Sequence, residues 1–404
     1  MRILKGALKH ATPTNAVYFF SFIAGWPCVF YLMGWLPNYQ INYLLLLGCC
    51  VILFLNRIND TSIPIPLLNM IIVQALAWIF YFAAYHDTAY ITRICLLLIT
   101  ALLICLQSRD RSMAFLRLFN GWIALQVILG AIGFLLFFAG LLEPLFTFRE
   151  MDGRPGYFFG LFTTNTYIAP FIRVAGFFDE PGAFAFWGIY ALLLNKLFID
   201  SKKIENILLI GLVVTFSIAY FIQAAVYIAC FMKRQRGKML LILALIFASL
   251  KLIALQSPEF DQAIFGRLEY NEETGTLSGD NRTDLAEHTS KIFYSSPFFG
   301  VGASNLADPK YGFVGANFFT TLAADGIFGF FIIWMPILYL FYLGRYRTKY
   351  KYAALILIIG FLQRPYDCAQ LLYPLLTFTM CLYAYLQKRG FQYSTPSATI
   401  PNTH

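Results

Sequence analysis

Three charged residues and a Pro-Gly pair interrupt an apolar stretch at 173–187, RVAGFFDEPGAFAFW. An arginine at a membrane surface can reach lipid headgroups, pair with a carboxylate, or bind a phosphate through its planar fork of donors. Pro181 suits the first turn of a helix, and Asp179 and Glu180 would then lie at the positive end of that helix. Capping explains the two acids but not Arg173, which is therefore the first candidate for anion binding.

A second polar stretch, 278–305, supplies another arginine. The run 283–294 is predicted to be helical, which places Arg282 at a helix N-terminus, where free backbone N–H groups favour an anion. The following PFFGVG, 297–302, is predicted to end this helix in a turn built on proline and two glycines.

Charged residues also lie within apolar runs, where they are functional candidates by default. Asp325 could pair with Arg93 or with Arg364, or it could act directly, and we leave these alternatives open. Arg364, in the stretch FLQRPYDCAQ, is a candidate for phosphate or sugar contact.

The elements that position these residues are predicted to be membrane helices. The chain has 404 residues, 59% of them hydrophobic and only 13% charged, whereas a soluble domain is about one quarter charged. Several apolar runs approach the roughly 20 residues that span a bilayer. We therefore expect one all-α polytopic membrane domain over 1–404. Its twelve or so transmembrane helices are expected near 17–36, 41–56, 66–85, 89–107, 119–142, 182–199, 206–217, 218–232, 239–255, 317–341, 353–366 and 371–387.

The distribution of charge predicts the orientation of these helices. With the N-terminus inside, most of the 30 Lys and Arg residues fall on inner-side segments, which is the positive-inside pattern. The net charge of +9 is thus topological and needs no nucleic-acid partner. Loop one, about 142–181, and loop two, about 256–316, then lie on the outer face. The tail, about 390–404, is expected to be disordered and cytoplasmic.

The segment 204–232 is too short to cross the membrane twice as two full-length helices. Two basic clusters flank 204–232, so keeping both inside requires an even number of crossings. About 29 helical residues cover roughly 43 Å, whereas two crossings need roughly 60 Å. We predict two short or broken helices that turn near Ser217 and are partly shielded by neighbours. The alternative is a single long helix.

The cysteines do not indicate a further functional site, and the two metal-binding motifs that we sought are absent from the sequence. The eight cysteines lie in or beside apolar segments, which makes buried small hydrophobes a better interpretation than a disulfide framework. The chain has neither a CxxC pair nor an HExxH motif, so we predict no metal site.

The motifs, in their order, resemble those of the O-antigen ligase and O-antigen polymerase family of bacterial inner membranes. The elements are Arg173-Val-Ala-Gly176, Gly279-Asp-Asn-Arg282, Pro297-Phe-Phe-Gly300-Val-Gly302 and the helix from Asn317 through Gly329. The resemblance covers roughly residues 170–330 by motif and the whole chain by topology.

The resemblance implies a GT-C-like glycosyltransferase of the inner membrane, with its active site facing the periplasm and both termini in the cytoplasm. Donor and acceptor would be oligosaccharides linked to undecaprenyl pyrophosphate, and no cofactor or metal is implied. Arg173 and Arg282, with Arg364 as a further candidate, would hold the pyrophosphate, whose developing negative charge guanidinium groups can stabilise.

One position departs from the family. Ligases of this family typically carry His-Asn at the start of the helix after loop two, and this chain has Ala316-Asn317. The missing histidine favours the polymerase branch. Candidate catalytic groups are then His288, Glu287, Asp179 and Glu180, although acidic loop residues are often only solvated or capping. Candidate sugar contacts are Asp284, Asn317 and Tyr294.

The expected function is therefore polymerisation of lipid-linked O-antigen repeat units in lipopolysaccharide biosynthesis. The alternatives are an O-antigen ligase, a polymerase of another surface polysaccharide, and a flippase of lipid-linked sugars. A flippase would be expected to show internal repeats, and none is evident. A chain-length regulator protein is a partner implied by the resemblance alone.

Overall fold

The computed structural model describes most of residues 12–390. The gaps are 26–27, 37–38, 57–62, 111–112, 150–154, 163, 169–170, 313, 316, 364–369 and most of 256–281. Arg364, most of loop two before 282, and the tail after residue 390 therefore lie outside the described residues.

The structure is mostly helical, as expected for a membrane protein of this composition. Among the described residues, five helices are long and apolar enough to cross a bilayer: α5 (Ile65–Tyr85), α6 (Thr88–Asp110), α7 (Ala114–Phe138), α8 (Pro181–Leu194, continued by a π-helical turn, Asn195–Ile199) and α14 (Phe318–Leu343). The other α-helices that the structure describes are α2 (Pro13–Ile23), α3 (Val29–Leu32), α4 (Tyr39–Leu55), α9 (Lys202–Gly211), α10 (Ile218–Phe231), α11 (Arg236–Ala254), α13 (Arg282–Ser295), α15 (Thr348–Gln363) and α16 (Leu372–Lys388).

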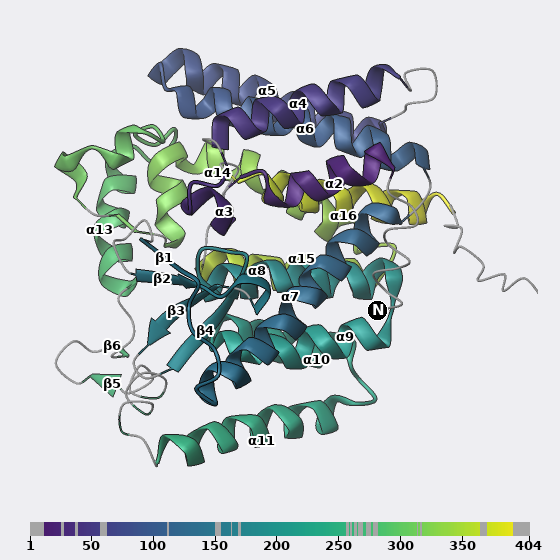
Figure 1. Ribbon diagram of the computed structural model, residues 1–404. Helices are drawn as coiled ribbons and strands as arrows, with labels where there is room; N and C mark the ends of the chain where they lie inside the picture. The colour runs from purple at the N-terminus through teal and green to yellow at the C-terminus, as the bar shows by residue number, and fades with distance from the viewer. Residues whose placement is uncertain are drawn as a thin grey trace, which may run out of the picture.

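Helix α8 forms the centre of the structure. Every residue of α8 is buried, as expected for a helix that is apolar on all sides. Helices α4, α5 and α6 lie together on one side of the molecule and α11 lies on the other (Figure 1). Exposed residues such as Ile65, Leu76 and Leu135 lie on α5 and α7. These outward apolar side chains are suited to contact with lipid acyl chains.

The first predicted span, 17–36, is wrong as a continuous helix. Helix α2 ends at Ile23, and Cys28 instead forms a β-bridge with Phe178. The backbone N–H of Val29 donates to the carbonyl of Phe177 at 2.8 Å. The chain leaves the helix because its backbone is paired with the segment that precedes α8.

The short hairpin predicted within 204–232 is confirmed. Helix α9 continues into a 3₁₀ turn, Leu212–Thr215, and the chain reverses at Phe216, whose φ of 47° is left-handed, before α10 begins. Thr215 and Ser217, on either side of the reversal, are buried. Neighbouring elements therefore shield this irregular backbone, as the predicted turn near Ser217 requires.

Loop one folds into a sheet that the sequence analysis did not anticipate. Strands β1 (Phe146–Arg149), β2 (Pro155–Phe158), β3 (Thr164–Ile168) and β4 (Phe171–Gly176) form an antiparallel meander. Figure 1 shows these strands and α13 at the same end of the helices.

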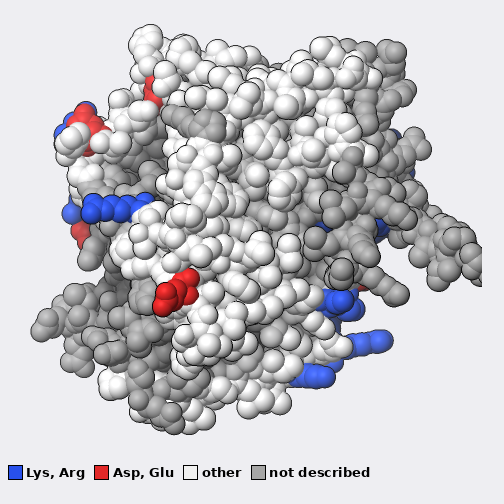
Figure 2. Space-filling model, viewed as in Figure 1, with Lys and Arg blue, Asp and Glu red and all other residues white. Residues whose placement is uncertain are grey.

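Most of the face in Figure 2 carries no charge, and a group of basic side chains lies at the opposite end, near the start of α9.

Candidate functional site

Arg173 lies on β4, at the end of the helices where the sheet is located. Its side chain is half-buried, and it donates from Nε to the carbonyl of Thr215 at 3.0 Å and from Nη2 to the carbonyl of Phe216 at 3.2 Å. These carbonyls belong to the turn between α9 and α10, where backbone acceptors need partners outside the helices. Arg173 therefore joins the sheet to the short hairpin, a structural role that the sequence analysis did not weigh.

The acidic pair after β4 lies at the start of α8, as predicted. Glu180 occupies the N-cap position with extended backbone angles, and Pro181 is in the first turn. The Glu180 side chain makes no capping hydrogen bond. Its negative charge is nevertheless stabilised by the positive end of the α8 dipole. Gln126 of α7 accepts from the backbone N–H of Phe177 at 2.7 Å and fixes this segment beside α7.

Helix α13 confirms the helix predicted for loop two and begins at Arg282. The side chains of Arg282 and Asp284 lie outside the described residues. His288 is exposed, and its Nε2 lies 2.5 Å from the carbonyl oxygen of Tyr311. Because a carbonyl only accepts, Nε2 carries the proton, and Nδ1 is the nitrogen that could act as a base.

Two other candidates on α13 are exposed. The carboxylate of Glu287 pairs with Lys291 at 3.0 Å, and both side chains are largely solvated. The Tyr294 side chain is 69% exposed. The Glu287–Lys291 pair is an ordinary (i, i+4) surface pair, and the catalytic and sugar-binding roles of these residues stay predictions.

Asn317 has a structural position at the start of α14. Its Oδ1 accepts from the backbone N–H of Phe319 at 2.9 Å, and its Nδ2 donates to Thr289 Oγ1 and to the Val314 carbonyl, each at 2.9 Å. The residue is 3% exposed. Asn317 thus caps α14 and fastens it to α13, while its expected contact with sugar stays a prediction.

A buried ion pair lies between α6 and α14. Arg93 Nη1 and Asp325 Oδ2 are 2.8 Å apart, with side-chain exposures of 3% and 0%. The hydroxyl of Tyr90 donates to Asp325 Oδ1 at 2.9 Å. The guanidinium lies over the rings of Trp78 and Tyr90, 4.9 and 5.0 Å from their centroids. The structure therefore confirms Arg93 as a partner of Asp325.

Helix α14 is broken next to this ion pair. Gly326 has φ 65° and ψ −173°, a conformation outside the helical region and essentially restricted to glycine. The break separates Ala323 and Ala324 on one side from Ile327 and Phe328 on the other. In a membrane span, the backbone groups exposed by such a break need polar partners.

The PFFGVG segment, 297–302, supplies those partners, and we call it the plug loop. Its Val301 and Gly302 N–H groups donate to the carbonyls of Ala323 and Ala324, each at 2.9 Å. Its Pro297 and Phe298 carbonyls accept from the N–H groups of Ile327 and Phe328 at 2.8 and 3.1 Å. The loop thus completes the hydrogen bonding on both sides of the break.

Two glycines permit this close approach. A Cβ on Gly300 would lie 2.3 Å from the Ala324 carbonyl oxygen, and a Cβ on Gly326 would lie 2.3 Å from the Phe298 carbonyl. The sequence predicts the turn at 297–302 but not its insertion into α14. The available signal was the Asp-Gly pair inside an apolar span, together with a Gly-x-Gly loop a short distance before it.

The connection between α5 and α6 holds the plug loop from the other side. Tyr85 donates to the Gly300 carbonyl at 2.9 Å. Asp87 accepts from the backbone N–H of Ser304 at 2.7 Å and from its hydroxyl at 2.6 Å. Burial raises the pKa of Asp87, but hydrogen bonds from Ser304 and from the Ala89 N–H outweigh this effect and hold that pKa below its ordinary value.

The comparisons with known proteins place the chain in no family. No family model, no curated protein and no solved structure matches this chain. The site therefore rests on its own geometry. Within the described residues, the structure joins α13 to α14 and β4 to the short hairpin, and it places both assemblies at one end of the helices (Figure 1).

Proposed function

We propose that this chain is an O-antigen polymerase, a glycosyltransferase that joins undecaprenyl-pyrophosphate-linked repeat units at the periplasmic face of the bacterial inner membrane. The proposal begins from the resemblance of its four motifs to the O-antigen ligase and polymerase family. It includes about twelve membrane crossings, a GT-C-like architecture, and both termini in the cytoplasm.

The observation that supports the proposal most directly is the position of the two arginine-bearing elements. Arg173 lies on β4, and Arg282 begins α13, at the same end of the helices (Figure 1). The plug loop and Asn317 fasten α13 to α14, so the start of α13 has a fixed support on the membrane helices. Rigid placement is what a site for a charged leaving group needs.

In the proposed reaction, a hydroxyl at the non-reducing end of one lipid-linked unit attacks the anomeric carbon of the growing chain. The new glycosidic bond forms as the bond from that carbon to the pyrophosphate oxygen breaks. Undecaprenyl pyrophosphate leaves with the electron pair, and guanidinium groups stabilise its negative charge. The hydroxyl proton passes to a base, for which His288 Nδ1 is one candidate and the acidic pair Asp179 and Glu180 another. Direct displacement of this kind inverts the anomeric carbon.

The proposal is tested in a strain deleted for this chain and complemented with variants. The deletion should leave lipid A-core carrying a single repeat unit, because ligation still works. Loss of all O-antigen from lipid A-core, with long polymer held on undecaprenyl pyrophosphate, would instead identify a ligase.

Arg282→Ala should abolish the polymer ladder while the protein still accumulates in the membrane. Lys291→Ala, on the same helix and also removing one positive charge, is the matched control and should keep the ladder. Arg173→Lys should impair polymer formation, because lysine keeps the charge but loses the fork that reaches two carbonyls. A wild-type ladder in Arg282→Ala would contradict the assignment of Arg282 to the pyrophosphate site. A wild-type ladder in Arg173→Lys would show that polymer formation does not need the contacts of Arg173 with the two hairpin carbonyls.

A further inference from the structure

A second candidate site lies at the opposite end of the helices from the sheet. A pocket of about 470 Å³ opens where α10 ends and the turn to α11 begins, against the first residues of α9 and α15. Its described lining contains four basic side chains, Lys202, Lys233, Arg234 and Lys349, and no acidic one. Figure 2 shows basic side chains grouped at this end of the molecule.

Two of the four cations are held in place by the protein. Lys202 Nζ lies 2.7 Å from Glu205 Oε2, and this buried carboxylate also accepts from the hydroxyl of Tyr227 at 2.6 Å. Lys349 Nζ donates to the carbonyl of Leu197 at 2.5 Å. These contacts orient one wall of the pocket and use part of the positive charge there.

The other two cations are available to a ligand. Lys233 and Arg234 lie in the turn after α10, and both are exposed. Within the described part of the chain, neither has a carboxylate within ion-pair distance. An arginine and a lysine side by side can bind a phosphate through a guanidinium fork and a point charge.

The remaining wall is apolar. Phe231 and Met232 line the pocket, and the Phe231 ring packs edge-on against Tyr352, with centroids 5.9 Å apart. Helix α10 is apolar up to Phe231 and gives way directly to Lys233 and Arg234. The pocket thus lies where an apolar helix meets a basic turn, which is the geometry of a membrane–water boundary.

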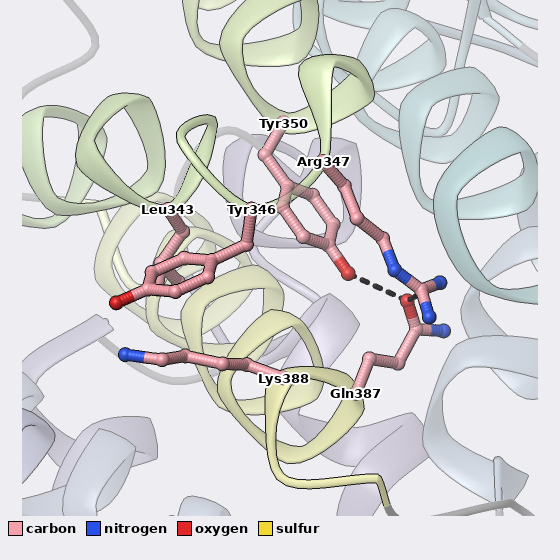
Figure 3. A pocket seen from close by; sticks show the side chains of 6 residues that line it. All are labelled: Leu343, Tyr346, Arg347, Tyr350, Gln387 and Lys388. Atoms are coloured by element: carbon pink, nitrogen blue, oxygen red, sulfur yellow. Dashed lines mark hydrogen bonds between the residues drawn. The ribbon is translucent and has the colours of Figure 1, made fainter.

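A smaller basic pocket nearby makes a useful contrast. It measures about 200 Å³ and is formed where α14, α15 and α16 meet. There, Tyr350 and Arg347 both donate to Gln387 Oε1, at 2.5 and 3.4 Å (Figure 3). The Lys388 Nζ lies 4.0 Å from the centroid of the Tyr346 ring. Its polar groups are occupied by one another, unlike Lys233 and Arg234.

We propose that the larger pocket binds the phosphate headgroup of an anionic membrane lipid. Basic pockets between membrane helices are suited to such headgroups. The phosphate would lie against Lys233 and Arg234, and the start of the acyl region would lie against Phe231 and Met232. The apolar wall favours a lipid over a soluble phosphate, which would gain nothing from it. This site is independent of the proposed glycosyl transfer.

The test compares two variants that each remove two positive charges from the same end of the molecule. Lys233→Gln/Arg234→Gln changes the pocket, and Lys203→Gln/Arg236→Gln changes two exposed residues that do not line it. Binding of phosphatidylglycerol to the full-length protein in neutral detergent is titrated by native mass spectrometry. Phosphatidylcholine and inorganic phosphate serve as the comparison ligands.

We expect the pocket variant to bind phosphatidylglycerol about 30-fold more weakly, which at 1.4 kcal/mol per factor of ten corresponds to about 1 kcal/mol for each charge. The matched variant should bind like the wild type, and phosphatidylcholine should bind weakly to all three proteins. Equal weakening in both variants would show attraction to the general surface charge and would overturn the site. Saturation by millimolar inorganic phosphate with no preference for phosphatidylglycerol would overturn the lipid assignment.

Cys230 gives a second measurement that does not depend on lipid retention in the gas phase. It lines the same pocket and is partly exposed. Its alkylation, followed by peptide mass spectrometry, should slow when phosphatidylglycerol is added to the wild type. The rate should not change in Lys233→Gln/Arg234→Gln. A rate that ignores the lipid in the wild type would contradict occupation of the pocket.

Discussion

The Arg93–Asp325 ion pair allows a double-mutant cycle with a calculable outcome. Asp325→Asn removes the negative charge 2.8 Å from Arg93 Nη1 but keeps an oxygen that can accept from the Tyr90 hydroxyl. Arg93→Met removes the positive charge and keeps an unbranched side chain of similar length. The double variant removes both charges from a site where the two side chains are 3% and 0% exposed.

Each single variant leaves one uncompensated charge in a buried site, which costs about 3–5 kcal/mol. The double variant leaves none, so it loses mainly the contacts of the guanidinium with the Trp78 and Tyr90 rings, up to about 2 kcal/mol. The double variant should therefore be more stable than either single variant. The coupling free energy between the two positions, which is the amount by which the two single costs together exceed the double cost, should be at least about 4 kcal/mol.

The free energy of unfolding is measured in detergent micelles by titration with sodium dodecyl sulfate, for the wild type and the three variants. Costs that add within about 0.5 kcal/mol would refute the reasoning, because independent sites behave in that way. The polymer ladder of complemented cells supplies a separate measurement. A stable double variant that still forms polymer would give the pair a structural role, and a stable one that forms none would give the charges a direct role.

Two further predictions concern the plug loop. Gly326→Ala should destabilise the protein by at least about 3 kcal/mol, because it combines a glycine-only backbone conformation with a Cβ 2.3 Å from Phe298. Gly121→Ala, within α7 and with nothing within 4 Å of its Cβ, is the matched control and should be neutral or stabilising by up to about 1 kcal/mol. Equal thermal midpoints for the Gly326→Ala and Gly121→Ala variants would contradict this reasoning. The lowered pKa of Asp87 means that its ionised form stabilises the fold above the ordinary carboxyl pKa, and that this contribution is lost as pH falls through the folded-state pKa. The difference in thermal stability between the wild type and Asp87→Asn should therefore shrink as pH is lowered below about 4, and a constant difference would argue against the Ser304 contact.

Several features could be predicted because they depend on local properties of the sequence. Apolar runs and the distribution of charge indicated a helical membrane protein. The short distance between two basic clusters indicated the hairpin at α9 and α10, since the length of a helix follows directly from its residue count. Asp325 needed a partner in an apolar span, and Arg93 was one of two candidates.

The features that were missed depend on contacts between distant segments. The strands of 146–176 are four to six residues long, and short strands are stabilised by their neighbours more than by their own sequence. Gly326 alone did not indicate a break, because glycine is common in membrane helices. The plug loop gives Gly326 its role, and no local pattern showed that the two segments meet. The side chains of Arg282 and Arg364 lie outside the described residues, so their predicted contact with the pyrophosphate stays a prediction.

The short hairpin has a consequence for the bilayer itself. Helix α10 has 14 residues and is about 21 Å long, which is about 9 Å less than the hydrocarbon thickness of an average membrane. Ile218 and Ile222 on this helix are exposed, so lipid would contact it directly if α10 crosses the bilayer as proposed. Such a mismatch costs a fraction of a kcal/mol per ångström and draws the surrounding leaflets closer together. On the proposed orientation, the membrane would be thinnest beside the turn that Arg173 binds, which shortens the path of a lipid-borne pyrophosphate from its leaflet to that arginine.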